Sequence, residues 1–327
     1  MEQSAVRDGV TAEEVKGILL GMASGQETLL GYFRRFIRNF EKRVGINRTV
    51  GSLRAYSNAY SHIERFLQAQ YKLSDIPFSA LDRSFIDKYD LYLRTERNLA
   101  PGTIINLTVQ LKTIVGEAIA DGIITASPFM GYEPVRPKHV QKYLTAEELH
   151  RIMTTPLHRQ TLYHVRDMFL FSCFTGIPYG DMRLLTKDNL CLAEDGIWWI
   201  KSARQKTKIE FEIPLLDLPL QILKKYSGTA PGDKLLPMYC NSTLNLYLKE
   251  IARICHIDRP LVFHAGRHTY ATEITLSHGV PLETVSRMLG HSQIETTQIY
   301  AKVTDEKIDA DTKTLNRKIS ERFSVVI

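Results

Sequence analysis

Three prolines in a short segment near the middle of the chain constrain the fold more than any other feature. Pro128, Pro134 and Pro137 lie within residues 127–142, and proline both removes a backbone donor and disfavours helix in the residue before it. Helical patterns end before this segment and resume after it, so one continuous helical body is excluded. A chain of 327 residues is long enough for two domains with separate cores. We predict an arm at 1–26, a helical domain at 27–127, a connector at 128–142 and a second domain at 143–327.

The first domain is predicted to consist of four helices. In four stretches, apolar residues recur three or four positions apart, as they do along one face of an amphipathic helix. The first pattern runs from Thr28 to Val44, and the others run from Leu53 to Leu67, from Leu81 to Leu93 and from Ile104 to Ala118. The sequence therefore favours a four-helix module.

The second domain is predicted to be helical with a small β-sheet. Thr145 and Glu148 have the spacing of a capping box, which marks the start of a helix. Between Ile197 and Ile213, aromatic and β-branched residues flank a polar centre, which is typical of a β-hairpin or a three-stranded sheet. The expected fold class is mainly α, with one small sheet in the second domain.

An excess of positive charge favours a polyanionic partner. The chain has 42 Lys and Arg against 36 Asp and Glu, a formal net charge of +6, and a pI near 9.0. Nine basic and four acidic residues lie between positions 25 and 75. On the first predicted helix Arg34, Arg38 and Lys42 repeat every four positions, and this stripe suits DNA phosphates. A merely solvated helix face is the alternative interpretation.

Several classes of protein and of site are disfavoured. The four cysteines are far apart and include no C-x-x-C pair, so neither a disulfide framework nor a zinc finger is expected. No apolar run is long enough to span a membrane, and the amino end is polar and acidic, unlike a secretory signal. No Walker A or dinucleotide-binding glycine motif occurs. We expect a cytoplasmic protein without membrane contact, metal or cofactor.

Four sequence elements suit attack on a phosphodiester. They are His264-Ala265-Gly266-Arg267-His268, Leu289-Gly290-His291-Ser292, Tyr300 and Arg204-Gln205-Lys206-Thr207. His264 and Arg267 lie three apart, so an imidazole and a guanidinium on one helical face reach the same phosphate. Gly290 is placed to end a helix, and Ser292 with Glu295 is spaced as a capping box for the next one. Tyr300 is expected on that next helix, where nearby cations favour loss of the phenolic proton during attack.

With H-x-x-R, L-G-H and the terminal Tyr in that order, the chain resembles the tyrosine recombinase, or phage integrase, family over nearly its whole length. The resemblance implies an N-terminal SAM-like core-binding domain and a catalytic domain that together clamp duplex DNA for site-specific recombination. It implies that Tyr300 attacks a DNA phosphate, forms a 3′-phosphotyrosyl bond and releases a 5′-hydroxyl, without metal or ATP. By the same resemblance Arg267 binds the phosphate, His264 and His291 assist charge and proton handling, and Lys206 is the general acid for the leaving oxygen.

One position departs from the family pattern. Most members have an arginine directly after a T-G-L/I element, whereas Thr175-Gly176-Ile177 is followed here by Pro178. Arg204 is the candidate replacement, because side chains two apart on a strand point to the same face, and a strand that delivers Lys206 also delivers Arg204. The pattern resembles a subgroup of mobile-element integrases, common in Bacteroidetes, in which the first arginine is displaced.

Arg183 and Asp181 are further candidate site residues near the missing arginine. Arg183 is the second candidate for the missing arginine, although five helical positions after Pro178 turn it about 140° from the expected face. Asp181 matches the family's acidic position, where it orients a neighbouring donor, and a solvated helix charge is the alternative.

Other interpretations stay open. His264 and His268 have the i, i+4 spacing of a zinc-binding helix, but Ala265 stands where the metalloprotease signature has Glu. The loss of an arginine at Pro178 leaves a catalytically impaired DNA-binding relative as one alternative, and a type IB topoisomerase, which uses similar tyrosine chemistry, is another.

The resemblance also implies partners. They are double-stranded DNA, further copies of the chain in a homotetramer on synapsed sites, and accessory DNA-bending proteins, with a monomer expected away from DNA. The apolar tail, Phe323 to Ile327, is expected to dock on a neighbouring subunit.

Overall fold

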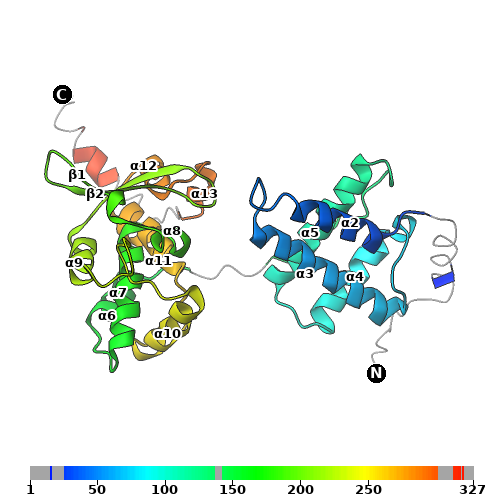
Figure 1. The fold of residues 1–327 in the computed structure, drawn as a ribbon, viewed down its shortest axis with the longest axis horizontal. Helices are drawn as coiled ribbons and strands as arrows, with labels where there is room; N and C mark the ends of the chain where they lie inside the picture. The colour runs from blue at the N-terminus through cyan, green and yellow to red at the C-terminus, as the bar shows by residue number, and fades with distance from the viewer. Residues whose placement is uncertain (1–14, 17–25, 137–141, 301–311, 318, 320–327) are drawn as a thin grey trace, which may run out of the picture. The chain divides into compact units, whose positions relative to one another are not determined.

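The chain divides into two compact units, Met1–His139 and Val140–Ile327, which are described separately (Figure 1). The computed structural model describes residues 15–16, 26–136, 142–300, 312–317 and 319. The point of division lies inside the predicted connector, and the finer boundaries stay predictions. Most of the predicted arm and the tail Phe323 to Ile327 lie outside the described residues.

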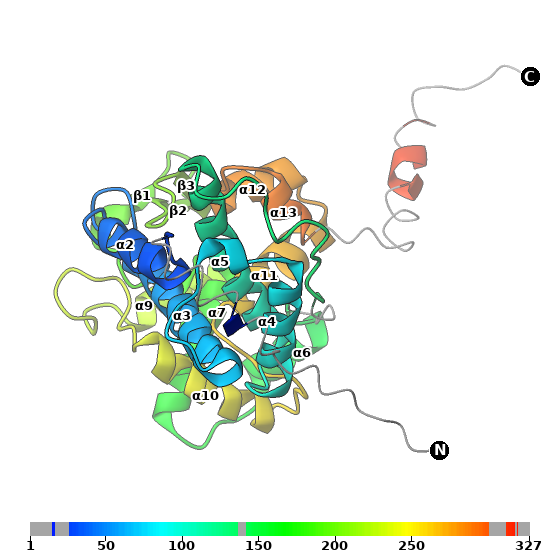
Figure 2. The same cartoon turned by 90° about the vertical axis from the view of Figure 1, so that its right-hand side faces the viewer.

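Between residues 26 and 136, the first unit contains four α-helices, as the periodicity predicts. They are α2 (Leu29–Glu41), α3 (Val50–Phe66), α4 (Arg83–Thr95) and α5 (Pro101–Ala120). Side-chain caps begin two of them, because Thr49 accepts from the amide of Ser52 and Asp82 from that of Phe85. The central helix is α3, which packs against α2, α4 and α5 (Figure 2).

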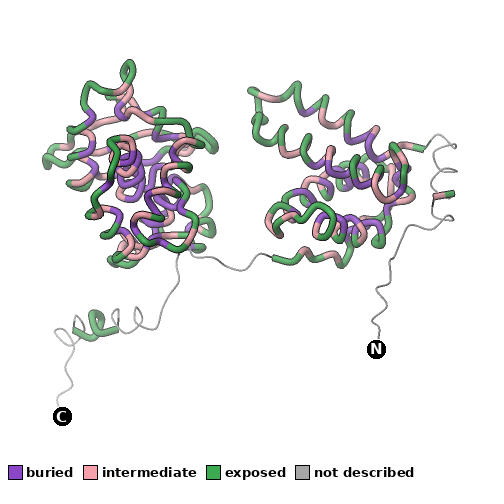
Figure 3. Tube along the Cα trace, turned by 90° about the horizontal axis from the view of Figure 1, so that it is seen from below, coloured by how far each residue is buried: buried purple, intermediate pink, exposed green. Residues whose placement is uncertain are grey.

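Aromatic side chains fill much of the interior of the first unit. The ring of Phe66 contacts those of Phe85, Tyr89 and Tyr92, with centroids 5.1 to 5.3 Å apart. Figure 3 shows the result along the trace, with buried residues on the inner faces of the helices and exposed ones outside. The charged residues of each helix therefore remain on its outer face.

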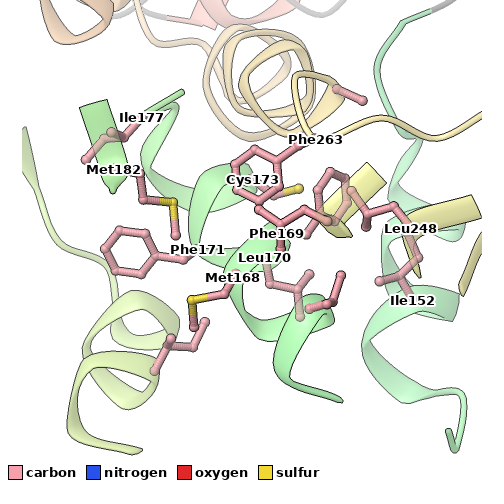
Figure 4. Packing of buried hydrophobic residues seen from close by; sticks show 14 of the residues in the cluster. Ile152, Met168, Phe169, Leu170, Phe171, Cys173, Ile177, Met182, Leu248 and Phe263 are labelled. Atoms are coloured by element: carbon pink, nitrogen blue, oxygen red, sulfur yellow. The ribbon is translucent and has the colours of Figure 1, made fainter. Parts of the chain in front are cut away.

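The second unit is organised around α7 (Gln160–Thr175). This helix is apolar on nearly all sides from Met168 to Phe174, as expected for a helix surrounded by others. The elements packed against it are α6 (Ala146–Thr154), α9 (Asp217–Lys225), α10 (Asn241–Ile254) and α11 (Ala265–Thr269). Phe169 and Phe171 of α7 lie in the core with Ile152, Leu248 and Phe263 from its neighbours (Figure 4). The predicted capping box of Thr145 and Glu148 is present at the start of α6.

A three-stranded antiparallel sheet completes the second unit. Its strands are β1 (Leu190–Leu192), β2 (Trp198–Ala203) and β3 (Glu210–Pro214), in that order. Ile200 pairs with Ile213 across β2 and β3, and both are buried. Much later in the chain, α12 (Leu282–Leu289) packs against β3 and is followed by the short α13 (Glu295–Gln298). The predicted fold class, mainly α with a small sheet in the second unit, is confirmed.

Candidate active site

A cavity of about 770 Å³ in the second unit brings together six of the side chains that the sequence analysis selected. They come from the β2–β3 turn, from α11 and the residue before it, and from the segment that follows α12. The six are Arg204, Lys206, His264, Arg267, His291 and Tyr300. Stretches almost a hundred residues apart in the sequence thus meet at one opening.

Arg267 is fixed by the ends of two helices. Its side chain is buried, with 3% of the residue exposed. Nη1 donates to the carbonyl of Gly176, the C-cap of α7, at 2.9 Å, and Nη2 to that of Leu289, the last residue of α12, at 2.7 Å. Carbonyls at helix ends lack intrahelical partners and carry the negative end of the helix dipole, so they suit a guanidinium. Burial and the nearby Arg204 lower the pKa of Arg267 to about 10, which leaves it charged at neutral pH.

Arg204 lies beside Arg267 because both use the same acceptor. Its Nη1 donates to the carbonyl of Leu289 at 3.1 Å. Its Nε lies 2.7 Å from Oδ2 of Asp181, an ion pair whose alignment falls short of a hydrogen bond. The other oxygen of Asp181 accepts the amide N–H of Gln205 at 2.9 Å. A buried carboxylate therefore holds both the second guanidinium and the backbone of the turn that carries it.

The prediction that Arg204 and Lys206 lie on one strand is wrong. Strand β2 ends at Ala203, so Arg204 and Lys206 lie in the turn and the alternation of strand side chains does not apply to them. Backbone bonds between Arg204 and Ile209 and between Lys208 and Arg204 close this turn. Lys206 is exposed and lines the cavity. Arg204 reaches the site through Asp181 and Leu289 instead.

The position of the missing arginine is occupied by the residue before α8 (Tyr179–Met182). Pro178 is its N-cap, and its backbone is extended. Arg183, the second candidate, is the exposed C-cap of the same helix and is not part of the cavity lining. Of the two candidates, Arg204 is the one that lies with Arg267.

His291 is held on both ring nitrogens. Its Nε2 lies 2.8 Å from Nη2 of Arg267, and its Nδ1 lies 2.7 Å from Oγ1 of Thr297. Gly290, with φ +64°, ends α12 as predicted and turns the chain so that His291 faces the cavity. Burial, followed by the charges of Arg267 and Arg204, lowers the pKa of His291 to about 4, so the imidazole is neutral at neutral pH.

Tyr300 lies in the turn after α13, where a helix was predicted. The helix ends at Gln298, and the N–H of Tyr300 donates to the carbonyl of Thr297 at 3.0 Å. The capping box expected from Ser292 and Glu295 is wrong: the N-cap is Ile294, whose side chain has no hydroxyl or carboxylate to accept a backbone bond. The helix is a single turn.

The ring of Tyr300 is 7% exposed and borders both the cavity and a small apolar cluster. It stacks on the imidazole of His291, with centroids 6.2 Å apart and planes 12° apart. On another side the ring of His268 meets it edge-on at 5.0 Å, and His268 in turn contacts His264 at 4.9 Å. A phenol thus lies among three imidazoles and two guanidinium groups that line one cavity.

The other two imidazoles also favour the neutral form. Desolvation and the neighbouring His264 lower the pKa of His268 to about 4, and desolvation with the charge of Arg267 lowers the pKa of His264. Among the described residues, no third His, Cys, Asp or Glu joins this pair in a group that could hold a metal ion.

The predicted DNA-binding stripe lies on α2. Arg34, Arg38 and Lys42 are all exposed, and the guanidinium of Arg34 donates to the hydroxyl of Tyr60 and lies over its ring. A second basic pair, which the sequence analysis did not select, lies on α2 and just beyond its end. Arg35 and Arg43 line a groove of about 390 Å³ that is shared with α5.

Two residues of the site were missed in the sequence. His268 was given no catalytic role, although it follows Arg267 directly and lines the cavity. Thr297 was not considered at all. A hydroxyl three residues before Tyr300 was the available signal, but a single threonine carries little information without the hydrogen bond to His291.

Comparison with known families agrees with this geometry. Residues 142–307 match the model of the phage integrase family, and residues 28–134 match the phage integrase SAM-like domain. The chain belongs to the phage integrase family. The integrase is 25% identical over 273 residues to the tyrosine recombinase XerD of Listeria monocytogenes serovar 1/2a, which covers 78% of this chain and 89% of the relative. It is 26% identical over 297 residues to XerD of Staphylococcus saprophyticus, covering 86% and 96%.

Solved structures show the same fold. The Tn1549 transposon integrase in complex with transposon right end DNA superposes with a TM-score of 0.68 at 19% identity, covering 88% of this integrase and 99% of that chain. A lambda integrase dimer bound to a COC′ core site gives 0.68 at 18% identity, covering 85% and 100%. The enzyme class predicted from the sequence, a tyrosine-type site-specific recombinase, is confirmed by the relatives. In the described part of the integrase, no helix combines the length and apolar character that a membrane span requires.

Proposed function

We propose that the integrase breaks and rejoins duplex DNA with Tyr300 as the nucleophile. The observation that carries this proposal is the meeting of Tyr300 with Arg267, Arg204 and His291 at one cavity. Two guanidinium groups provide planar donors for the nonbridging oxygens of a phosphate and stabilise the charge that grows on them during attack. Their fixed contacts with helix-end carbonyls supply this stabilisation without reorganisation.

In the proposed step, the phenolic oxygen of Tyr300 forms a bond to phosphorus and the bond from phosphorus to the 5′ oxygen breaks. The ammonium group of Lys206 gives a proton to that leaving oxygen, and a 5′-hydroxyl results. The phenolic proton is taken up by the imidazole of His268, which meets the ring of Tyr300 edge-on and is neutral at neutral pH. The phosphotyrosyl bond retains the energy for rejoining, so the 5′-hydroxyl of a second strand reverses the step.

We also propose that Arg204 replaces the arginine that Pro178 displaces. The shared carbonyl of Leu289 and the ion pair with Asp181 support this assignment, and the exposure of Arg183 argues against the alternative. The likeness to the mobile-element subgroup rests on this same substitution and is part of the proposal.

The DNA-bound assembly belongs to the proposal as well. The structural relatives include a lambda integrase tetramer bound to a Holliday junction, which covers 86% of this chain at a TM-score of 0.68. We propose a tetramer on two synapsed sites for this integrase, with the stripe Arg34, Arg38 and Lys42 against phosphates and accessory DNA-bending proteins as further partners.

A nicked duplex that releases a short oligonucleotide after cleavage tests the proposed function. The released oligonucleotide takes the 5′-hydroxyl with it, so the strand cannot be rejoined. The covalent protein–DNA complex therefore accumulates and is quantified on a denaturing gel. We expect a complex with the unaltered integrase and none with Tyr300→Phe. Arg204→Ala should reduce its formation at least a hundredfold, whereas Arg183→Ala should leave it within about threefold. DNA binding without any complex would identify a catalytically silent relative.

A further inference from the structure

Thr297 contacts both His291 and Tyr300, and it has no part in the cleavage step proposed above. It lies on α13 and is fully buried. Its hydroxyl is 2.7 Å from Nδ1 of His291, and its carbonyl accepts the N–H of Tyr300 at 3.0 Å. One residue is therefore bonded through its side chain to one reacting group and through its backbone to the other.

The contacts of His291 fix the position of its proton. A guanidinium only donates hydrogen bonds, so Nε2 of His291 accepts from Arg267 and carries no proton. In the neutral imidazole the proton then lies on Nδ1. Since that nitrogen donates, Oγ1 of Thr297 is the acceptor.

This arrangement also limits how the imidazole can turn. The other tautomer would place a proton between Nε2 and the N–H of Arg267. A flipped ring would bring ring carbons to both contacts and leave the Thr297 hydroxyl without its partner. The ring plane lies only 12° from that of Tyr300, so a rotation of the imidazole would disturb the stack against the phenol. The orientations of the two rings are coupled through α13.

We propose that Thr297 is a positioning residue that holds His291 as the Nδ1–H tautomer and, through the same helical turn, sets the place of Tyr300. This inference rests on the proposed function for the catalytic roles of His291 and Tyr300. Its structural part, the tautomer of His291, does not depend on cleavage. Arg267 then meets a lone pair on Nε2.

Two substitutions of Thr297 separate the hydroxyl from the volume of the side chain. Thr297→Val keeps the shape and removes the hydroxyl, whereas Thr297→Ser keeps the hydroxyl. A matched control is Thr275→Val, because Thr275 is also buried but its hydroxyl donates to the carbonyls of Tyr270 and Ala271. The control loses a buried hydroxyl in the same unit without a histidine partner.

The first measurement is the rate of covalent complex formation in a single turnover on the nicked duplex. Loss of the acceptor leaves a buried N–H unsatisfied, so we expect Thr297→Val to slow cleavage about tenfold to a hundredfold at unchanged DNA affinity. Thr297→Ser and Thr275→Val should stay within about threefold of the unaltered integrase. Equal losses in Thr297→Val and Thr297→Ser would overturn the proposal, since the methyl group would then be the part that matters.

The second measurement is the nitrogen NMR spectrum of the integrase labelled in its histidines, with His291 assigned from the spectrum of His291→Gln. The proposal requires the Nδ1–H tautomer at neutral pH in the unaltered protein and in Thr297→Ser, and a change of tautomer or a mixture in Thr297→Val. An Nε2–H tautomer in the unaltered protein overturns the proposal even if every variant fails to fold. An unchanged tautomer in a folded Thr297→Val also overturns it.

The two measurements distinguish failure of this inference from failure of the proposed function. If Tyr300 forms no covalent complex but His291 has the Nδ1–H tautomer and loses it in Thr297→Val, the function is wrong and the positioning contact stands. If cleavage occurs and the tautomer does not depend on Thr297, the function stands and this inference fails.

Discussion

Gly290 shows how a backbone requirement at one residue affects the charged groups around it. Its φ of +64° is a left-handed conformation, and a Cβ placed there would lie 2.8 Å from Cγ of Arg204. Glycine is needed here both for the turn and for the space that Arg204 occupies. The motif was predictable from the sequence as a helix end, but the contact with Arg204 was not, since Arg204 lies 86 residues earlier in the chain.

We therefore expect Gly290→Ala to impair cleavage more than folding. The control is Gly279→Ala, because Gly279 has φ +80° and open space around its Cβ position. Both variants should lose about 1–2 kcal/mol of unfolding free energy from backbone strain in urea titrations. Gly290→Ala alone should reduce the rate of covalent complex formation, by about tenfold or more, because Arg204 is pushed from Leu289. Equal cleavage rates in the two variants would show that this contact is unimportant.

The low pKa of His291 predicts a dependence of stability on pH. Its pKa of about 4 lies below the ordinary value of 6.5, so the unfolded chain binds a proton more readily between these values. The stabilising contribution is present above about pH 6.5 and is lost as the pH falls toward 4. From pH 7 to pH 4, the unfolding free energy of the integrase should fall by about 2 kcal/mol more than that of His291→Gln, after allowance for partial exposure. Parallel curves from urea titrations would contradict this.

At the scale of elements, the β2–β3 turn is where the sequence was least informative. Hydrophobic periodicity predicted the helices of the first unit, and aromatic and β-branched residues predicted the sheet. The limits of β2 were not predictable, because residues 204–208 contain no glycine or proline and Lys208 adopts φ +60° without such a signal. Similarly, α13 is only one turn long, which the spacing of Ser292 and Glu295 did not predict. The active-site residues were identified from their order, whereas the contacts that hold them depend on the folded unit.

Asp181 anchors this turn, and its charge should matter for cleavage. Asp181→Asn retains an oxygen for the N–H of Gln205 but removes the charge beside Arg204. We expect a loss of about 2–3 kcal/mol in unfolding free energy, below the range of fully buried pairs because Arg204 is partly exposed, and slower cleavage. Asp195→Asn is the control, since Asp195 accepts the N–H of Ile197 in the β1–β2 turn. If both variants behave alike, the anchoring is a matter of turn geometry and not of charge.

At the scale of the whole molecule, we expect the two units to have different roles, with cleavage in the second unit and contacts to DNA phosphates in the first. The second unit holds the cavity, and the first carries exposed cations along α2. The two-unit organisation followed from three prolines, whereas the basic pair Arg35 and Arg43 was missed because aromatic residues lie between them in the sequence. Binding that depends on phosphate contacts is salt-dependent, since each contact releases counterions.

Substitution of Arg34, Arg38 and Lys42 by glutamine should lower the salt dependence of DNA binding. If all three contact phosphates, the slope of log K against log salt should become less steep by about two to three. Arg65, Arg97 and Lys112 are also exposed in the first unit, so their substitution gives the same change in net charge. The control should change the slope by less than about one. Equal effects would assign the slope to overall charge, and the stripe would then be a solvated face.

The most direct test of the central claim identifies the atom that becomes attached to DNA. The covalent complex from the nicked duplex is digested with protease and nuclease, and the peptide that carries a nucleotide is sequenced by mass spectrometry. We predict a single modified residue, Tyr300, joined to a 3′-phosphate, with a free 5′-hydroxyl on the released oligonucleotide. Attachment at any other residue, or a 5′-phosphate on the released strand, would contradict the account.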